Sequence, residues 1–528
     1  MVGLCPVKAM SPRARAHAFC TQKINSVSQR RTMAGQAMVL GLVMLLVLCV
    51  GVIVLFDTGQ TVNKKIELVN AADAAAYSVA VQEARALNYA AYANRARVAN
   101  EVAIAQVIGL YSWMNQFHTT SIVLEKVMSV LAKIPYVGPI FQALSSVFKA
   151  IGQALKGIRR AYHGVAQAAV TALDMLNGAL ATSSRAILVG VARVDGILVA
   201  RDIVKRNSAD AALSAVGTGV LGAQLLSANN SFLQSYRIPR SRAGGGSAGS
   251  AQDRKGADRF RNVVMQSRDP FSWSRSDHDL NLFLIKFNQS GGTDMVDYNR
   301  WVAADAMGLE ISLPWPLDDI NIPLGWGGAQ AVERYNQQRF MSGFGNGSGW
   351  VSEFNNNRRY RPYGDIRREN RAASSIIDSD PNVRLDNGQK KGAYFTGYQG
   401  LRDYDDVKSG QGLRPYTEPG SRANPASNTG PIFTVHVETD VAKARTSAAI
   451  DGIGGPAGSP MALEDKAAGG KISAYASGQV YFNRPPDYAL FKRGDNRLEV
   501  GNLFSPYWQA RLTDTPNSVE ALLGITRL

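Results

Sequence analysis

Cysteine is almost absent from the chain. The 528 residues contain Cys5, Cys20 and Cys49, and no cysteine follows Cys49. A disulfide framework and a cysteine-ligated metal site are therefore excluded from the long remainder. An apolar core must hold that remainder together, and a hydrophobic content of 45% over roughly two to four domain lengths is sufficient for one.

Acidic residues are missing before Asp57. The same segment contains six basic residues, which are Lys8, Arg13, Arg15, Lys23, Arg30 and Arg31. The uncharged run Ala37–Phe56 would extend about 30 Å as a helix, which matches the thickness of a hydrocarbon core. We therefore predict a transmembrane helix over residues 37–56 that contacts membrane lipid, and a basic cytoplasmic tail over residues 1–36.

The basic tail also predicts the orientation of the chain. Basic residues favour the cytoplasmic side, so the body should be exported from a single-pass anchor. Lys64 and Lys65 oppose this bias with only two charges. The alternatives are a buried core helix, for which the run is too uniformly apolar, and a cleaved signal, for which it is too long and is followed by no A-x-A pattern.

Proline is absent between Pro12 and Pro135 and again between Pro139 and Pro239. Because proline is excluded from helix interiors, residues 57–239 are predicted to be a helical stalk and hairpin region, broken near Pro135–Pro139. The apolar stretch Ser121–Leu155 reads as an amphipathic hairpin, either buried in the core or lying on a membrane surface.

The Gly- and Ser-rich segment 240–256 is predicted to be a flexible linker. Residues 257–528 should then form an exported α+β or mainly β domain, with strands at Leu280–Phe287, Phe433–Val437 and Lys471–Phe482. Gly325–Gly328 and Gly454–Gly455 are interpreted as turns. The predicted fold class is a membrane-anchored α+β protein with a transmembrane helix, a long alanine-rich helical region and a loop-rich, strand-containing C-terminal domain.

The stretch from Asn70 is rich in alanine, the strongest helix former. Ala72, Ala76, Val79 and Ala80 recur at three- and four-residue steps and so share one helix face. We interpret them as helix-packing candidates, since small side chains allow another helix to approach closely. A solvated helix with a weak packing face fits the pattern equally well.

Catalytic and metal-binding motifs are also missing. No H-E-x-x-H, G-x-S-x-G or P-loop pattern occurs, and Asp277-His278-Asp279 is better read as an exposed turn than as a metal site. We therefore expect neither enzyme activity nor a cofactor. One basic cluster contains an aromatic residue, and its surface candidates are Arg358, Arg359, Arg361, Arg367 and Arg368. In an exported domain it favours a solvated loop or an anionic envelope polymer, not nucleic acid.

The segment from Gly35 to Ala76 resembles the N-terminal module of TadE/TadG-like proteins of the tight-adherence (Flp) pilus assembly system. The shared features are Gly35-Gln36-Ala37 at the start of the apolar run, Asp57 at its outer end and the Asn-Ala-Ala-Asp-Ala-Ala-Ala stretch from Asn70. The resemblance implies a bacterial inner-membrane protein with a periplasmic or surface-exposed body and pilin-like or other pilus-assembly partners.

This resemblance also raises the question of processing. Pilins and some family members are cut after a glycine, with a glutamate five residues into the mature chain. Gly35 and Gln36 are therefore the candidate processing site, but Leu40 stands where the glutamate would be. We expect the anchor to stay attached. No D-x-S-x-S motif of a von Willebrand A domain is present.

The expected function is a non-enzymatic role in pilus assembly or adherence. A membrane-anchored surface adhesin or binding module is the alternative. An envelope hydrolase is less favoured, because the sequence offers no convergent catalytic group.

Overall fold

The computed structural model describes residues 12–136, 138–190, 195–239, 250–273, 275, 280–282, 285–311, 320–334, 393–408, 429–444, 470–484 and 500–524. Side chains are described from Ala37 onward, except at several positions, most of them within the strands. Contacts divide the chain into two units. Unit 1 comprises Met1–Ala75, Arg201–Thr218 and Val435–Ala476, and unit 2 comprises Ala76–Ala200, Gly219–Thr434 and Ser477–Leu528. This division differs from a helical region followed by a separate C-terminal domain, because the early helices and the late strands pack within the same units.

Among the described residues, the long helices come first and most of the strands follow them. The helices are α1 (Pro12–Leu131), α2 (Gly138–Gly190), α3 (Gly196–Asn207), α4 (Ala215–Ser227), α5 (Ala251–Gln266), α6 (Pro270–Trp273) and α11 (Asn517–Leu522), with a π-helix η2 (Ala228–Phe232) and a 3-10 helix η5 (Val441–Ala444). The strands are β1 (Ala212–Leu213), β2 (Leu233–Tyr236), β3 (Leu280–Leu282), β4 (Ile285–Asp297), β5 (Arg300–Ile311), β6 (Ile320–Ala331), β7 (Ala393–Phe395), β8 (Tyr404–Val407), β9 (Thr429–Asp440), β10 (Lys471–Phe482) and β11 (Trp508–Thr513). The fold class is therefore α+β, as predicted.

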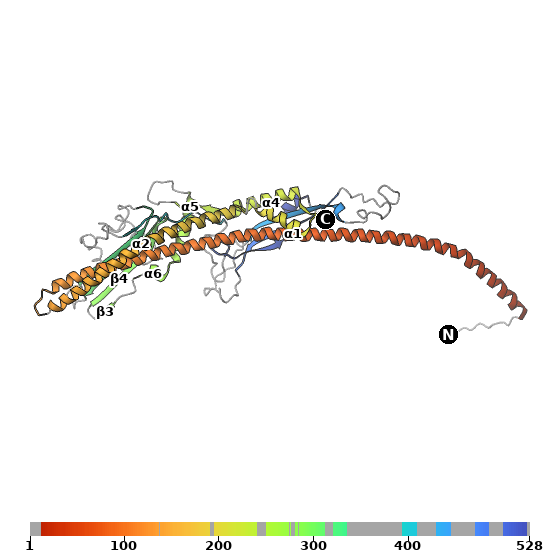
Figure 1. The fold of residues 1–528 in the computed structure, drawn as a ribbon. Helices are drawn as coiled ribbons and strands as arrows, with labels where there is room; N and C mark the ends of the chain where they lie inside the picture. The colour runs from red at the N-terminus through yellow and green to blue at the C-terminus, as the bar shows by residue number, and fades with distance from the viewer. Residues whose placement is uncertain are drawn as a thin grey trace. The chain divides into compact units, whose positions relative to one another are not determined.

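Helix α1 contains 120 residues and ends before Pro135, which cannot continue it. The chain then turns through Tyr136, whose φ is 69°, and α2 begins at Gly138. A Cβ at Gly138 would lie 2.3 Å from the Ala132 carbonyl oxygen, so the turn requires glycine there. The predicted hairpin is confirmed, and Figure 1 shows α2 running back alongside α1.

Two predictions for the region between the hairpin and the first sheet need correction. The stretch predicted to be helical includes two short strands, because β1 pairs with β9 and β2 pairs with β8 much later in the sequence. Ser235 of β2 and Asp405 of β8, for example, are 170 residues apart. The predicted flexible linker is helical from Ala251 onward. Ser250 caps that helix by accepting a hydrogen bond from Asp253 N at 3.1 Å, a capping pattern that fixes a helix start.

The larger sheet of unit 2 has the strand order β3-β4-β5-β6-β7, antiparallel except for the parallel pair β6 and β7. The predicted strand Leu280–Phe287 is split between β3 and β4, with Leu280 opposite Phe287. A second sheet has the order β1-β9-β10-β11. Its strand β10 coincides with the predicted Lys471–Phe482, and the predicted Phe433–Val437 lies inside β9.

Gly325–Gly328 lie inside β6 and do not form the predicted turn. Their role is close approach by α1. A Cβ at Gly325 would lie 2.0 Å from Thr120 Oγ1, and one at Gly327 would lie 1.9 Å from the Ser112 carbonyl oxygen. The glycines therefore let the backbone of α1 lie directly against the strand. Gly454–Gly455 lie outside the described residues.

The core of unit 2 fills the space between α1, α5 and this sheet. Ile104 and Ile108 of α1, Phe260 of α5 and Trp301 of β5 belong to one buried cluster. Polar contacts accompany it. Arg275 Nε lies 2.5 Å from Asp305 Oδ1, and both side chains are buried. Burial raises the pKa of Asp305, and the Arg275 charge opposes that rise. Arg275 therefore offsets part of the free-energy cost of burying the Asp305 carboxylate.

The glycine contact generates the first prediction. We expect Gly327→Ala to lower the free energy of unfolding by about 1–3 kcal/mol, because its Cβ meets backbone that cannot swing away. The matched control is Gly157→Ala on α2, where nothing lies within 4 Å, and where alanine should stabilise the helix by about 0.5–1 kcal/mol. Thermal unfolding of the full chain in detergent, followed by circular dichroism, measures both. Equal effects of the two substitutions would contradict the close approach.

Candidate functional site

The apolar segment of α1 is exposed all along its length. Among the described residues, α1 from Ala37 is the one helix long and apolar enough to cross a membrane, and its most apolar window is 0% buried. Met38 and Leu55 are 77% and 73% exposed. Large apolar side chains on every face of a helix are typical of a segment that lies in lipid.

The segment just beyond this run is held by unit 1. Lys64 is buried, and its Nζ lies 3.1 Å from Glu67 Oε1 and 3.6 Å from Asp210 Oδ2. Lys65 Nζ donates to the Ser473 carbonyl oxygen. Both lysines that oppose the predicted orientation are therefore engaged in the folded unit.

Unit 1 also contains a serine–histidine pair that sequence analysis missed. Ser214 Oγ lies 2.5 Å from His436 Nδ1, although the two residues are 222 positions apart. The hydroxyl also accepts a hydrogen bond from Gly217 N at 2.8 Å, as expected of a residue that caps the start of α4. A Cβ at Gly217 would lie 2.7 Å from His436 Cβ, so the space beside the pair is closed. Burial lowers the pKa of His436. The arrangement is that of a helix cap.

The four helix-packing candidates are all fully buried. Gly478 of β10 covers two of them, because a Cβ on it would lie 2.4 Å from the Ala76 carbonyl oxygen and 3.1 Å from Ala80 Cβ. Within unit 2 this part of the face therefore packs against a strand of the same chain, whereas the two alternatives from the sequence were a second helix and solvent. Small side chains permit close approach by either element, and the sequence alone does not distinguish them.

Helix α1 is also joined to the C-terminal segment of unit 2 by asparagine side chains. Asn88 Nδ2 donates to the Trp508 carbonyl oxygen at 2.8 Å, and Trp508 N donates to Asn88 Oδ1 at 2.9 Å. Asn94 Nδ2 donates to the Leu503 carbonyl oxygen at 2.8 Å. These bonds provide backbone groups of the C-terminal segment with hydrogen-bond partners on α1.

Glu101 is the most connected buried carboxylate that α1 contributes to unit 2. Its Oε2 accepts from Trp301 Nε1 at 2.9 Å and from Tyr398 Oη at 2.7 Å, and its Oε1 accepts from Asn177 Nδ2 at 3.0 Å. Burial raises the pKa of Glu101, while the hydrogen bonds from Trp301 and Tyr398 and the Arg97 charge oppose that rise. One side chain thereby joins α1, α2, β5 and the segment after β7.

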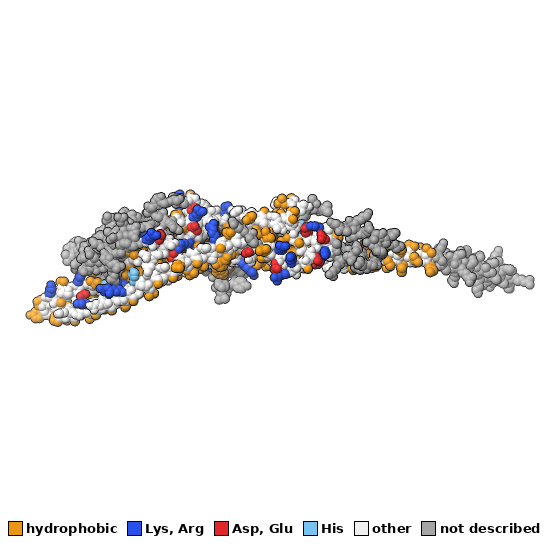
Figure 2. Space-filling model, turned by 45° about the horizontal axis from the view of Figure 1, so that its top comes forward, with side chains coloured by type: hydrophobic (Ala, Val, Ile, Leu, Met, Phe, Trp, Pro, Cys, Tyr) orange, Lys and Arg blue, Asp and Glu red, His pale blue; other side chains and the backbone are white. Residues whose placement is uncertain are grey.

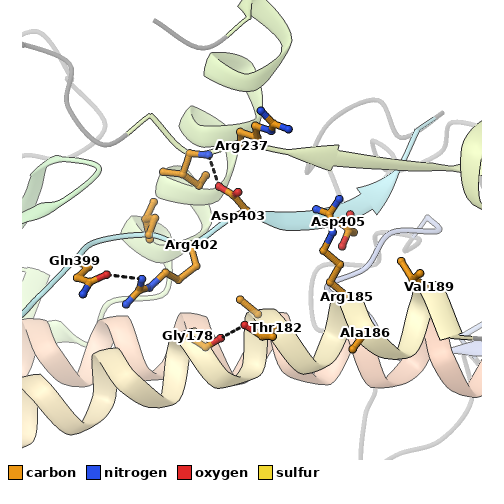
Figure 3. Close-up of a pocket in the computed structure, with 13 residues that line it drawn as sticks. Gly178, Thr182, Arg185, Ala186, Val189, Arg237, Gln399, Arg402, Asp403 and Asp405 are labelled. Atoms are coloured by element: carbon orange, nitrogen blue, oxygen red, sulfur yellow. Dashed lines mark hydrogen bonds between the residues drawn. The ribbon is translucent and has the colours of Figure 1, made fainter. Parts of the chain in front are cut away.

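A cavity of about 720 Å³ lies between α2 and the segments around Arg237 and Arg402 (Figure 3). Arg185 points from α2 toward Asp405. Arg402 donates to Asp174 Oδ2 at 2.5 Å and to Gln399 Oε1 at 2.8 Å.

Two further polar groups of the lining are also engaged in hydrogen bonds. Asp403 Oδ1 accepts from Ile238 N at 2.8 Å, and Thr182 Oγ1 donates to the Gly178 carbonyl oxygen. Because the hydroxyl is bonded to its own helix, this lining presents no activated nucleophile. The mixture of arginines and aspartates suits a small polar or charged group.

The remaining sequence candidates fall in two places. Gly35 and Gln36 lie in the backbone of α1. The basic cluster, from Arg358 to Arg368, and Asp277-His278-Asp279 lie outside the described residues. Within the described part of the chain, no group of three or more His, Cys, Asp or Glu residues is placed to hold a metal ion.

These features define a protein whose apolar helix, long enough to cross a membrane, continues into the core of an α+β body. The family model of Flp pilus-assembly TadE/G-like proteins matches residues 35–82, which is under a tenth of the chain. The match covers the apolar run, Lys64 and the buried alanine face. It confirms the resemblance of the N-terminal module. No curated protein and no solved structure matches the chain.

The alanine face generates the second prediction. We expect Ala80→Leu to lower the free energy of unfolding by about 1–3 kcal/mol, because the larger side chain would collide with Gly478. Ala74→Leu is the control, since Ala74 is only partly buried on the same helix, and its cost should be about half a kcal/mol. Thermal unfolding compares them. Equal losses of stability at both positions would contradict the contact between Ala80 and the strand.

Glu83 on α1 generates a prediction about pH. Burial raises its pKa from 4.5 to about 7, so the folded state keeps a proton that the unfolded state loses. The resulting loss of stability is absent below pH 4.5, grows as the pH rises and is complete above pH 7. We expect Glu83→Gln to raise the free energy of unfolding by about 3 kcal/mol at alkaline pH and to change it little at acidic pH.

The control for Glu83 is the exposed acid Asp195. Thermal unfolding of Glu83→Gln and Asp195→Asn across the pH range separates a buried carboxyl from a general loss of charge. A constant difference between Glu83→Gln and the unmodified protein at every pH would contradict the shifted titration.

Proposed function

We propose that this chain is a non-enzymatic envelope component of a pilus-assembly system, anchored in the bacterial inner membrane by the apolar segment of α1 with its body exported. The observation that carries the proposal is the family match over residues 35–82. The matched module contains the exposed apolar run and also Ala76 and Ala80, which are core positions of unit 2. A family module that forms part of the core supports a function of the whole body in the same system.

The geometry also supports a specific contact surface for pilin-like partners. Because Gly478 covers Ala76 and Ala80, that part of the alanine face is not available to a partner. The apolar run is available. Ala37 and Gly41 are four residues apart on one face, and nothing lies within 4 Å of a Cβ placed at Gly41. This small-xxx-small pair would allow a second transmembrane helix to approach closely.

The absence of enzyme activity is part of the proposal. The cavity lining engages its hydroxyl and several of its charged groups in structural hydrogen bonds, and Ser214 serves as a helix cap. A surface adhesin on the same anchor is the second candidate, in keeping with the polar cavity beside α2.

The test compares two glycines of the apolar run. We expect Gly41→Leu to abolish crosslinking to pilin-like proteins and pilus-dependent adherence, because leucine fills the close-approach face. Gly51→Leu is the matched control, since Val47 and Leu55 stand four residues away and no small pair exists. Both variants keep the same hydropathy, so membrane insertion should be equal, and protein levels must be matched.

The outcomes distinguish the candidates. Loss with Gly41→Leu alone supports assembly through the membrane helix. Normal pili in a strain that lacks the protein, together with protease access to the body on intact cells, would contradict assembly and favour the adhesin.

A further inference from the structure

The end of the helical hairpin exposes an unusual amount of apolar surface. We call residues 126–151 the hairpin tip. Its exposed large apolar side chains are Val127, Val130, Ile134, Tyr136, Ile140, Leu144, Val147 and Ile151. Tyr136 at the turn is fully exposed, and Ile140 is 65% exposed. Figure 2 shows hydrophobic side chains gathered at the end of the hairpin, interspersed with Lys and Arg side chains.

These side chains follow the pattern of a helix face that meets an apolar phase. Ile140, Leu144, Val147 and Ile151 recur at steps of four, three and four residues, so they form one stripe along α2. Farther from the turn, α1 buries Ile104 and Ile108, whereas α2 still exposes Val165 and Met175. At the tip both helices expose large apolar side chains, so the possibility of a buried core, which the sequence left open, is excluded for it.

Positive charge surrounds this apolar surface. Lys126, Lys133 and Lys149 are exposed within the tip, and Lys156 and Arg160 follow on α2. Between residues 122 and 160 the sequence has one acid, Glu125. An apolar surface with a basic surround complements a bilayer that carries anionic headgroups, because lysine attracts the headgroups while apolar side chains enter the hydrocarbon boundary.

Other occupants match only one of these properties. An anionic polymer would pair with the lysines but offers no hydrocarbon to Ile140 and Leu144. A second copy of the tip would cover the apolar stripe but would bring like charges together. The uncharged interval from Ile134 to Phe148 is also too short to span a bilayer. We propose that the hairpin tip inserts its apolar side chains into the interface of an anionic phospholipid bilayer, in addition to the anchor at residues 37–56.

The test uses the full chain with its three cysteines changed to serine. An environment-sensitive fluorophore is attached at Ile140→Cys in the tip or at the control position Ser227→Cys, which is exposed on α4. The protein is reconstituted into nanodiscs. Spin-labelled phosphatidylglycerol is placed in the nanodisc in one arm and in added vesicles in the other, so that the two arms show which bilayer the tip enters.

We expect quenching and a blue shift at position 140 in one arm, and neither at position 227. Changing Lys126, Lys133 and Lys149 together to glutamine should weaken the interaction about a hundredfold, at about fivefold for each lysine. The double substitution Ile134→Asn and Leu144→Asn should abolish the interaction with lipid, because it removes apolar side chains that would enter the bilayer. These substitutions lie at exposed positions, and circular dichroism verifies folding.

Three results would overturn the proposal. The first is the absence of quenching at position 140 in both arms. The second is equal quenching by spin-labelled phosphatidylcholine with no effect of the lysine changes. That result would show that the tip does not depend on anionic headgroups. The third is energy transfer between labelled copies without lipid quenching, which would identify a second copy as the occupant.

Discussion

The buried carboxylate of Glu101 determines how the layers of unit 2 fit together. A carboxylate in an apolar interior is costly unless hydrogen bonds replace its water, and Glu101 obtains them from Trp301, Tyr398 and Asn177. Two of those partners are 200 and 297 residues away in sequence. A displacement of any of the elements that carry them would leave a buried donor or acceptor without a partner, so the network favours one arrangement over other compact ones.

The glycines of the strands impose a second constraint on the same helix. Gly327 and Gly478 each leave room for the backbone of α1, one on each sheet. Because α1 also carries the family module, the part of the chain that matches pilus-assembly proteins and the part that builds the body's core overlap. A partner that binds the apolar run would therefore contact the same helix that contributes Ala76 and Ala80 to the core of unit 2.

Sequence predicts the features that depend on local composition. The apolar run, the break near Pro135 and the strand Lys471–Phe482 follow from charge, proline and β-branched content, and the structure confirms them. Features that depend on distant partners are missed. Gly327 looked like a turn because glycine is the usual signal for positive φ, whereas its role is to lack a Cβ. Ala80 showed a packing face but not that a strand would fill it. Glu101 resembles any acid on a helix surface until its partners are known.

The bonds from Asn88 and Asn94 have a consequence for biosynthesis. Their acceptors, the carbonyl groups of Trp508 and Leu503, are 420 and 409 residues later in the chain. At about 5–20 residues per second, a ribosome would synthesise Leu503 and Trp508 tens of seconds after it has made this part of α1. During that interval an alanine-rich helix can form alone, but its core face has no strand to cover it. The newly made chain would thus expose this face until its last strands arrive.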